Sequence, residues 1–402
     1  MSGPLSGIRV LDLSRVLSGP SCAKALLDLG ADVIKVEPPE GDLTRSAHPR
    51  VDGIPVYFAQ QNCGKRCVSI DLRTEQGTEL ALGLIVRSDV VIENFRPGVM
   101  ARLGLGYEVA SERNPRIVYC SISGYGQDGP AAARRAYAPV IHAELGLLEL
   151  VGRRLGVDPR PEAVSHADLY SGIQAAFAIT AALYQRESTG RGQHVDVSMA
   201  EVMLQSTEWT AVELAGGEGD SFHVFGGANA PVLRLGDGTV VCVPGDPVST
   251  FPAWCKVMGR PELLDDERFA TPEARRGNRG ALRIELQAFA SVVPSFSAFE
   301  EVIGRQRMAV GRLNDIAHLL EDPWVSAREA IVDVGANGAP LHLPRSPFRF
   351  SAAEAGTSGR PASQGEHNAD VLCEVLGLDD ATVAALERAG VLVRRPVGGS
   401  DG

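Results

Sequence analysis

Long hydrophobic runs are absent from the sequence, and their absence excludes membrane-spanning classes of protein. No apolar stretch approaches the roughly 18 residues that a membrane span needs. The N-terminal run Met-Ser-Gly-Pro-Leu-Ser-Gly lacks the basic start and the apolar stretch of a secretory signal peptide. We therefore expect a soluble, cytoplasmic protein that does not act at a membrane.

Paired cysteines are also lacking. The seven cysteines are scattered, and none forms a Cys-x-x-Cys pair. Cys63 and Cys67 are separated by three residues, with no second pair or histidine cluster that would complete a zinc site. An odd, scattered set of this kind is typical of reduced thiols in the cytosol that act as small buried apolar residues. The sequence thus predicts neither a disulfide framework nor a metal site.

Positive charge is scarce in the chain as a whole. The net charge of the 402 residues is −11, which argues against a general nucleic-acid binder. A small anionic ligand would instead need a local group of basic residues, and such a group falls in the first third of the chain. Its members are Lys65, Arg66, Arg73, Arg96, Arg102, Arg134 and Arg135.

Familiar nucleotide and hydrolase motifs are missing or misplaced. The chain has no Walker A, His-Glu-x-x-His or Gly-x-Ser-x-Gly sequence. Gly124–Gly129 matches G-x-G-x-x-G, but Pro130 follows it at once and the match comes late in the chain. The first strand-to-helix turn, at 14–20, has no such glycine pattern. We therefore do not expect a nicotinamide or flavin cofactor.

The first half of the chain alternates between short apolar strands and helices. This pattern predicts an α/β fold with a doubly wound, Rossmann-like parallel sheet. The expected strands are 8–13, 32–37, 67–72, 89–93, 116–123 and 193–199, and the expected helices include 22–29, 75–87, 143–151 and 200–214. Ligands of such sheets bind beyond the carboxyl ends of the strands, which here are 14–18, 73, 94–96 and 124–126.

The second half of the chain predicts a smaller α+β domain. Two short strands flank a Gly-Asp-Gly turn at 236–238, which is a hairpin signal, and short helices then dominate. Strands are expected at 330–334 and 345–350, and the last helices at 368–376 and 380–389. We predict a large domain over 1–220, with its boundary in the glycine-rich stretch 216–220, and a small domain over 221–330. A return segment, 331–402, would pack its helices on the large domain.

The most informative stretch of the sequence is 165–172, which contains Asp168. After Gly172, apolar residues recur with a helical period, which places Asp168 just before or in the first turn of a largely apolar helix. The positive end of that helix would keep the carboxylate ionised, as a nucleophile or base requires. The alternative is that Asp168 or Ser171 only caps the helix.

Several runs together resemble the family III CoA-transferases, the formyl-CoA transferase and carnitine CoA-transferase (CaiB/BaiF) type. The resemblance covers nearly the whole chain in the right order. It is carried by VLDLSRVLSGPSCAKALLDLGADVIKVEPPEGD at 10–42, QNCGKRCVSIDLRT at 61–74, VIENFRPG at 91–98, NPRIVYCSISGYGQDGP at 114–130, ADLYSG at 167–172, TGRGQHVDVSM at 189–199, EDPWVSARE at 321–329 and QGEHNADVL at 364–372.

The resemblance implies a function and a set of site residues. Asp168 takes the place of the family's aspartate nucleophile, which carries CoA from an acyl-CoA donor to a carboxylic acid acceptor as an aspartyl-CoA thioester. CoA is then a substrate, and no permanently bound cofactor is implied. The resemblance also implies a homodimer of interlocked subunits. The positions that would contact CoA are Val16, Leu17, Ser18, Leu72, Arg73, Asn94, Phe95, Arg96, Arg102, Arg135 and Tyr137.

The chain departs from formyl-CoA transferases at two positions of this set and its surroundings. They have glutamine where Leu17 stands and a basic residue where Pro38 stands. Leu17 cannot hydrogen-bond a small polar acyl group, which argues against formyl or oxalyl specificity. The family's usual glycine-rich loop over the active site is not evident around 244–250.

Two other functions stay open at this point. The superfamily includes α-methylacyl-CoA racemases, which pair the aspartate with a histidine in a Gly-His-Asp run. This chain has Arg135-Ala136-Tyr137 there, and a tyrosine with a pKa near ~10 is a poor proton acceptor. His142 and His166 lie close to Asp168 in sequence, but a structural role is expected for each. The third alternative is a CoA-binding protein without catalytic activity.

Overall fold

A computed structural model describes residues 2–216, 229–335, 339–357 and 359–395. The chain divides into two compact units. Unit 1 comprises residues 1–147, 161–207 and 323–402, and unit 2 comprises 148–160 and 208–322. The predicted boundary stretch, 216–220, lies outside the described residues except for Gly216, so the predicted domain limits stay predictions.

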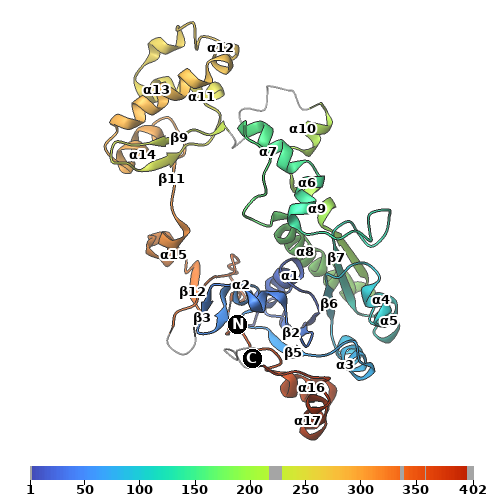
Figure 1. The fold of residues 1–402 in the computed structure, drawn as a ribbon. Helices are drawn as coiled ribbons and strands as arrows, with labels where there is room; N and C mark the ends of the chain where they lie inside the picture. The colour runs from blue at the N-terminus through green and yellow to red at the C-terminus, as the bar shows by residue number, and fades with distance from the viewer. Residues whose placement is uncertain (1, 217–228, 336–338, 358, 396–402) are drawn as a thin grey trace. The chain divides into compact units, whose positions relative to one another are not determined.

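Unit 1 is built on a six-stranded parallel sheet, as the alternation of strands and helices predicts. Its order is β5-β2-β1-β6-β7-β8, and every neighbouring pair is parallel. Figure 1 labels β2, β5, β6 and β7 of this sheet. If only these six strands are counted, the order is 3-2-1-4-5-6, that of a doubly wound nucleotide fold. The strands are β1 (Arg9–Asp12), β2 (Asp32–Glu37), β5 (Arg66–Ser69), β6 (Val90–Glu93), β7 (Val118–Ser123) and β8 (His194–Ser198).

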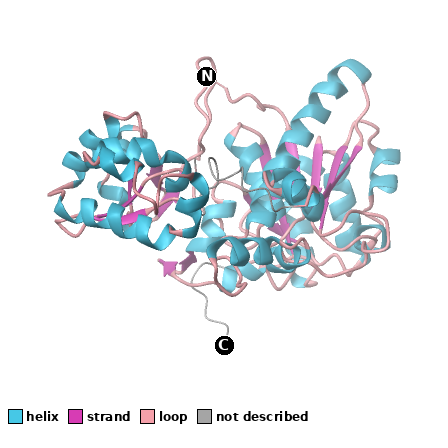
Figure 2. Cartoon of the chain, turned by 90° about the horizontal axis from the view of Figure 1, so that it is seen from above, coloured by secondary structure: helices cyan, strands magenta, loops and turns pink. Residues whose placement is uncertain are grey.

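Helices cover both faces of this sheet (Figure 2), because its strands are apolar on both sides. One face packs against α1 (Ser18–Asp28), α6 (Ala138–Glu144), α8 (His166–Thr189) and α9 (Met199–Ser206). The other face packs against α3 (Glu75–Val86), α5 (Tyr107–Arg113), α16 (Asn368–Leu376) and α17 (Asp380–Arg388). The C-terminal helices thus pack on the sheet that the N-terminal half forms.

Shorter elements complete unit 1. They are α2 (Val56–Asn62), α4 (Val99–Arg102), α15 (Pro323–Ala327), the pair β3 (Arg50–Val51) and β4 (Ile54–Pro55), and the pair β12 (Ile331–Asp333) and β13 (His342–Pro344). No helix in the described part of the chain combines the length and apolar character that a membrane crossing needs. The cytoplasmic location expected from the sequence stays a prediction.

Unit 2 has its own core under a small antiparallel sheet. The hairpin predicted around Gly236–Gly238 is confirmed, and it gains a third strand that the sequence did not predict. The strands are β9 (Val232–Arg234), β10 (Val240–Cys242) and β11 (Gly311–Arg312), and the helices α11 (Pro247–Met258), α12 (Pro272–Gly277), α13 (Arg279–Val292) and α14 (Phe296–Gly304). Unit 2 also holds α10 (Thr210–Leu214) and most of α7 (Leu147–Leu155).

Three local predictions are wrong. The helix expected over 143–151 is divided between α6 and α7, because Gly146 takes a left-handed conformation with φ of 74°. The helix expected over 200–214 breaks into α9 and α10 near Thr207. The strand expected over 345–350 does not form, since Pro347 lacks the N–H that a sheet ladder needs, and the strand instead lies at β13.

Candidate functional site

Asp168 is the third residue of α8, in the first turn, as the sequence predicts. Its half-buried carboxylate accepts a hydrogen bond from the backbone N–H of Ala138, the first residue of α6. The structure gives no support to the capping alternative, because the hydrogen bond that Asp168 accepts comes from another helix and the N-cap residue Ser165 makes no side-chain cap. The Ser171 hydroxyl donates instead to the carbonyl of Ala167 at 2.6 Å. The Asp168 carboxylate is therefore available for another role.

Burial changes the acidity of Asp168 from what the sequence suggests. A carboxyl at the positive end of a helix is expected to keep an ordinary or low pKa. In the structure, desolvation raises the pKa of Asp168 to about 6, and the hydrogen bond from Ala138 only partly opposes this shift. The group is still roughly 90% ionised at pH 7, but it is less stabilised by solvent than an exposed carboxylate.

The helix that carries Asp168 crosses α1 at very close range (Figure 1). Gly172, one turn after Asp168, permits this approach. A Cβ atom at Gly172 would lie 2.1 Å from the Ser21 hydroxyl oxygen and 2.6 Å from the Ser18 carbonyl oxygen. Asp168 is thus held next to the first turn of α1 and the predicted contact residues that precede it.

The loop between β1 and α1 contains Val16 and Leu17, Ser18 is the first residue of α1, and neighbouring side chains fix the path of this stretch. Val16 has a φ of 65°, a strained conformation for a β-branched residue. Asn94, at the end of β6, accepts a hydrogen bond from the backbone N–H of Arg15 at 2.8 Å. Its amide nitrogen donates to the Arg15 carbonyl and to the Ser18 hydroxyl. Asn94 therefore holds this loop directly.

A buried ionic network supports the same loop from below. Lys65 donates to the Asp12 carboxylate at 2.8 Å and to the carbonyl of Pro20 at 2.9 Å. Lys35 donates to the Ser14 carbonyl at 3.0 Å and pairs with Asp42 at 3.1 Å. These ammonium groups are fully buried, so leaving either one unpaired would be costly. The network makes the loop a rigid part of the sheet end.

An open cavity of about 550 Å³ lies beyond the carboxyl ends of β1, β2, β5 and β6. That volume is in the range of a small-molecule site. Predicted contact residues Leu72, Arg73 and Phe95 line it. The full lining is Leu13, Arg15, Val36, Glu37, Pro38, Glu40, Gly41, Leu43, Asp71, Leu72, Arg73, Phe95, Val99 and Leu103.

Arg15 is a cavity residue that the sequence analysis missed. Its guanidinium lies over the ring of Phe95, 4.7 Å from the centroid. Its Nε atom is buried without a hydrogen-bond partner among the described residues. Burial lowers the pKa of this guanidinium, and the negative charges of Asp42 and Glu40 oppose the shift only in part. The group still keeps its charge, because the ordinary pKa of arginine is so high. Its position directly before the predicted contacts 16–18 was the one available signal.

The arginines that were predicted to contact CoA lie on the surface. Arg73 pairs with Asp71 at 2.7 Å and with Glu40 at 2.9 Å. Arg96, Arg102 and Arg135 are exposed, and within the described ranges no ion pair holds their side chains. Tyr137 is exposed too, directly before Ala138, and so lies next to the bond that reaches Asp168.

The predicted basic group does not form one cluster. Lys65 is buried in the network described above. Arg66 pairs with Asp32 and Glu374, and Arg134 pairs with Glu144. This prediction is wrong for these three residues, because acidic neighbours distant in sequence neutralise them.

Tyr57, on α2, is a second missed residue. The residue is 41% exposed, and the pKa of its hydroxyl is raised by burial and by the negative charges of Asp168 and Asp42. Tyr57 therefore lies within electrostatic range of the carboxylate. Nothing in its local sequence signals this proximity, because α2 and α8 are far apart in the chain.

The histidines near Asp168 have packed environments. His142 is 3% exposed, and its Nε2 accepts a hydrogen bond from the backbone N–H of Ala167 at 3.1 Å. His166 pairs through Nδ1 with Glu162 at 2.7 Å and stacks on Tyr170. Both histidines are engaged by neighbouring residues, as the structural role expected from the sequence requires.

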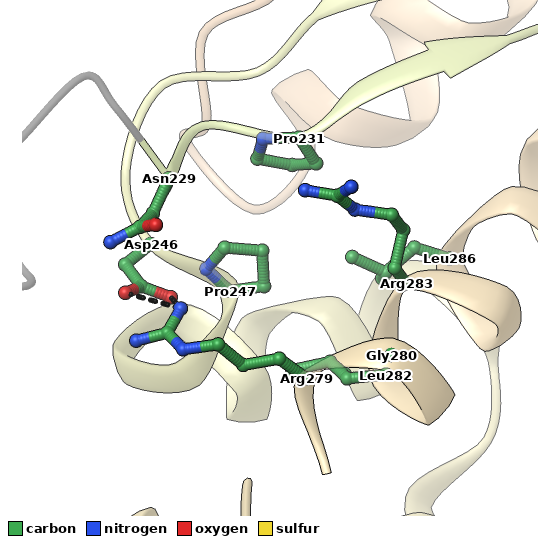
Figure 3. Close-up of a pocket in the computed structure, with 9 residues that line it drawn as sticks. All are labelled: Asn229, Pro231, Asp246, Pro247, Arg279, Gly280, Leu282, Arg283 and Leu286. Carbon is green, nitrogen blue, oxygen red and sulfur yellow. Dashed lines mark hydrogen bonds and ion pairs between the residues drawn. The ribbon is translucent and has the colours of Figure 1, made fainter. Parts of the chain in front are cut away.

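A second cavity, of about 220 Å³, lies in unit 2 (Figure 3). It contains no predicted site residue. Asp246 is fully buried there, caps α11 through the Val248 N–H, and pairs with Arg279 of α13 at 2.9 Å. The pair joins two helices of the unit 2 core. No cluster of His, Cys, Asp and Glu side chains suited to a metal ion occurs among the described residues.

The G-x-G-x-x-G match lacks the geometry of a dinucleotide fingerprint. Residues 127–137 form turns and no helix, and the next helix begins only at Ala138. Gly124 is needed for another reason, since a Cβ atom there would lie 2.3 Å from that of Ala136. Gly124 therefore serves the packing of this loop, whereas Gly126 and Gly129 allow its left-handed backbone, with φ of 89° and 81°.

The chain is similar to a known protein family and to named enzymes. The model of CoA-transferase family III matches residues 5–368. A formyl-CoA:oxalate CoA-transferase of Streptomyces avermitilis is 36% identical over 98% of this chain and 100% of its own length. An acetyl-CoA:oxalate CoA-transferase of Acetobacter aceti is 36% identical over 87% of this chain and 90% of its own.

A human protein and a solved structure are also similar to this chain over most of its length. A succinyl-CoA:glutarate CoA-transferase of Homo sapiens is 31% identical over 97% of this chain and 90% of its own length. The crystal structure of a CAIB/BAIF family protein from Brucella suis aligns with a TM-score of 0.80 and 35% identity. That alignment covers 93% of this chain and 100% of the Brucella chain.

Proposed function

The chain belongs to CoA-transferase family III, and we propose that it moves CoA from an acyl-CoA donor to a carboxylic acid acceptor through a thioester on Asp168. The observation that carries this proposal is the carboxylate itself. It is half-buried, has a pKa raised to about 6, accepts a hydrogen bond from Ala138 of another helix, and lies beside the first turn of α1, which Val16 and Leu17 precede and Ser18 begins.

The proposed reaction needs only this carboxylate and the two substrates. The ionised Asp168 oxygen attacks the thioester carbonyl, which forms a mixed anhydride and releases the CoA thiolate. The thiolate attacks the aspartyl carbonyl, so that the donor acid leaves and an aspartyl-CoA thioester remains. The acceptor carboxylate then attacks this thioester, which forms a second mixed anhydride and releases the CoA thiolate. The thiolate attacks the acceptor's carbonyl in that anhydride, so that the new acyl-CoA forms and the Asp168 carboxylate leaves.

Desolvation of Asp168 fits the first step. An exposed carboxylate is a weak nucleophile because water stabilises its charge. Partial burial removes some of that stabilisation, while the pKa of about 6 keeps the group ionised at neutral pH. The N–H of Ala138 supplies one fixed hydrogen bond, which orients the carboxylate without neutralising it.

We propose that CoA enters through the cavity at the end of the sheet. Arg15 and Arg73 there, with exposed Arg96, Arg102 and Arg135, would contact its phosphates, since guanidinium groups bind oxyanions bidentately. Arg15 supplies a cation in the cavity where Pro38 replaces the basic residue of formyl-CoA transferases. The remaining contacts would come from Val16, Leu17, Ser18, Leu72, Asn94, Phe95 and Tyr137.

Leu17 would influence which acyl group the site accepts. It is almost fully buried at the start of α1, close to the turn that contacts α8. An apolar side chain in this position favours acyl groups that present carbon, and not a polar oxygen, toward it. We therefore propose an acyl donor larger and less polar at this point than formyl-CoA.

Racemase activity is the second candidate, and the geometry favours it less. A racemase needs a proton acceptor on each face of the α-carbon. His142 is a histidine candidate for the second acceptor, but it is buried and its Nε2 already accepts the Ala167 N–H. Exchange of the α-proton of an acyl-CoA with deuterium, without CoA transfer, would identify a racemase instead.

The proposal is tested by the pair Asp168→Asn and Asp168→Ala. Both variants are expected to fold and to lose CoA transfer, because neither has a carboxylate that can form an anhydride. The asparagine variant would keep the shape of the side chain and the bond from Ala138. Substantial transferase activity in Asp168→Asn would overturn the proposal. Acyl-CoA binding by the wild type without any turnover would point to a non-catalytic protein.

We also propose that the protein is a homodimer of interlocked subunits, as the resemblance to this family implies. An apolar stripe on α8 supports a partner subunit. Ile173, Phe177 and Tyr184 follow a helical period and are 62%, 70% and 85% exposed in the single chain. Large apolar side chains gathered on one helix face are typical of a protein interface.

A further inference from the structure

The N-terminus of α8 is capped by a side chain from another helix. The first N–H groups of a helix have no partner within it and must find one elsewhere. Ser165, the N-cap residue, provides no side-chain acceptor. The backbone N–H of Ala167 donates instead to Nε2 of His142, at 3.1 Å, across to α6. This bond is buried and directly precedes Asp168 in the chain.

The direction of that bond determines the protonation state of His142. A backbone N–H can only donate, so Nε2 must present its lone pair. The imidazole is therefore neutral and carries its single proton on Nδ1. A second proton would sit on Nε2 and face the Ala167 N–H, donor against donor, and the bond would be lost.

The groups around His142 leave it neutral at pH 7. Burial lowers its pKa below the ordinary value, and His166 on α8 acts in the same direction. Glu162, in the segment before α8, raises it, but this carboxylate is already paired with His166 at 2.7 Å. The remaining acidic group nearby on α8 is Asp168, and α9, which also packs on α6, carries only the exposed Glu201.

Two hydrogen bonds in opposite directions join α6 to the first turn of α8. The N–H of Ala138 on α6 donates to the Asp168 carboxylate, and the N–H of Ala167 on α8 donates to His142. The short helix α6 thus holds both the backbone N–H of Ala167 and the carboxylate of Asp168. Loss of the second bond would release the turn on which the first depends.

We propose that His142 is the positioning residue for Asp168: as a neutral imidazole it anchors the first turn of α8, and its protonation releases that turn. This inference rests on the proposed function only for its effect on activity. It makes CoA transfer sensitive to acid through two groups, Asp168 itself and the histidine that holds its backbone. His142 takes no part in the chemical steps.

The test compares wild type with His142→Gln and His142→Leu. A glutamine Oε1 can accept the Ala167 N–H and does not titrate, whereas leucine cannot accept it. We expect leucine to lower kcat at least tenfold with little change in KM for the acyl-CoA, and glutamine to restore most of kcat. Unchanged kcat in His142→Leu would overturn the proposal.

The pH profile separates positioning from a merely structural role. Below pH 6, log kcat/KM should fall with a slope that approaches 2 in wild type, where Asp168 and His142 both take up a proton. In His142→Gln the slope should approach 1. Equal slopes in the two proteins would contradict a titrating anchor, and this comparison holds even if the leucine variant does not fold.

A readout independent of catalysis distinguishes failure of this inference from failure of the proposed function. Hydrogen exchange of the peptide that spans 164–170 is measured by mass spectrometry in wild type and His142→Gln at the same pH. Wild type should lose protection relative to the variant as the pH falls from 7 to 5. Identical protection at every pH would refute the anchor, whatever the activity of either protein.

Discussion

At the scale of the residue, the raised pKa of Asp168 comes from an environment that costs the protein stability. The pKa of its carboxyl rises from 3.8 to about 6 on folding because burial penalises the charge. Between these two values the folded state binds more protons than the unfolded state, so the contribution of this group to stability falls as the pH rises through about 4 to 6. At pH 7 the charge is retained against that cost.

Asp168→Asn is therefore expected to stabilise the protein at pH 7 while it abolishes transfer. A shift of about two pKa units corresponds to about 3 kcal/mol, an upper limit because the carboxylate is only half-buried. Thermal unfolding should show a higher Tm for the variant at pH 7, and the difference should disappear below pH 4. The exposed Asp128→Asn is the control and should change Tm little. A variant that is less stable than wild type at pH 7 would contradict this account.

Arg15 gives a second prediction at this scale. If its guanidinium binds a CoA phosphate, Arg15→Ala should lose a charge-assisted hydrogen bond of roughly 1.5–3 kcal/mol, which raises KM for the acyl-CoA about 10- to 150-fold. Arg15→Lys keeps the charge but loses the planar stack on Phe95, and should fall between. Arg113→Ala, at an exposed arginine of α5, is the matched control. An unchanged KM in Arg15→Ala would remove Arg15 from the site.

Individual residues show what a single sequence can and cannot reveal. The place of Asp168 in the first turn of an apolar helix was predictable because that is a local property, whereas its proposed role as nucleophile came from the family resemblance. Arg15 and Tyr57 were missed because the Phe95 ring beneath Arg15 and the Asp168 charge that acts on Tyr57 are distant from them in the chain. Lys65 was counted with the basic group for the same reason, since its partner Asp12 lies 53 residues earlier in the chain.

At the scale of the element, the crossing of α1 and α8 brings the site together. Two helices approach this closely only where one presents no side chain, and Gly172 provides that point on α8. The crossing sets the proposed nucleophile beside the loop 16–18, which Asn94 and the buried lysines hold from the other side. The geometry of the site is therefore a consequence of helix packing.

Gly172→Ala is expected to impair both stability and activity. The new Cβ would lie 2.1 Å from the Ser21 hydroxyl oxygen and 2.6 Å from the Ser18 carbonyl oxygen, so α8 must move away from α1. Such overpacking costs roughly 1–3 kcal/mol, and Tm and kcat should both fall. Gly280→Ala on α13 is the control, since a Cβ there meets no atom within 4 Å. A wild-type Tm and kcat in Gly172→Ala would contradict the close crossing.

Helices and strands were predictable where the period of the apolar residues agreed with the turn residues that flank them. The parallel strands, the start of α8 and the C-terminal helices follow from apolar runs bounded by turns. Failures came where one residue overrode a pattern, as Gly146 did between α6 and α7 and Pro347 did after β13. The third strand of the unit 2 sheet, β11, is very short and pairs with a distant partner, so no local signal marked it.

At the scale of the whole molecule, an acidic chain is proposed to bind an acidic substrate. The net charge of −11 opposes long-range attraction of CoA. Binding must then come from a few arginines at the end of one sheet, where strand ends from distant parts of the chain meet. This explains why composition argued against nucleic acid yet could not exclude a small anionic ligand.

The dimer is the prediction that belongs to this scale. Interlocked subunits should bury far more than the ~1,600 Å² of a standard interface, so light scattering should report a dimer at every concentration down to the nanomolar range. Phe177→Asp, on the exposed stripe of α8, should weaken that dimer because it would bury a charge. A stable wild-type monomer at micromolar concentration would refute the proposed dimer.

The central claim is the covalent carriage of CoA by Asp168, and intact-protein mass spectrometry tests it most directly. Wild-type protein incubated with an acyl-CoA donor and no acceptor should gain a CoA-sized adduct, which peptide mapping places on Asp168 and an added carboxylate acceptor removes. Asp168→Asn should gain none. Wild-type protein that turns over without ever forming this adduct, or that carries it on another residue, would contradict the account.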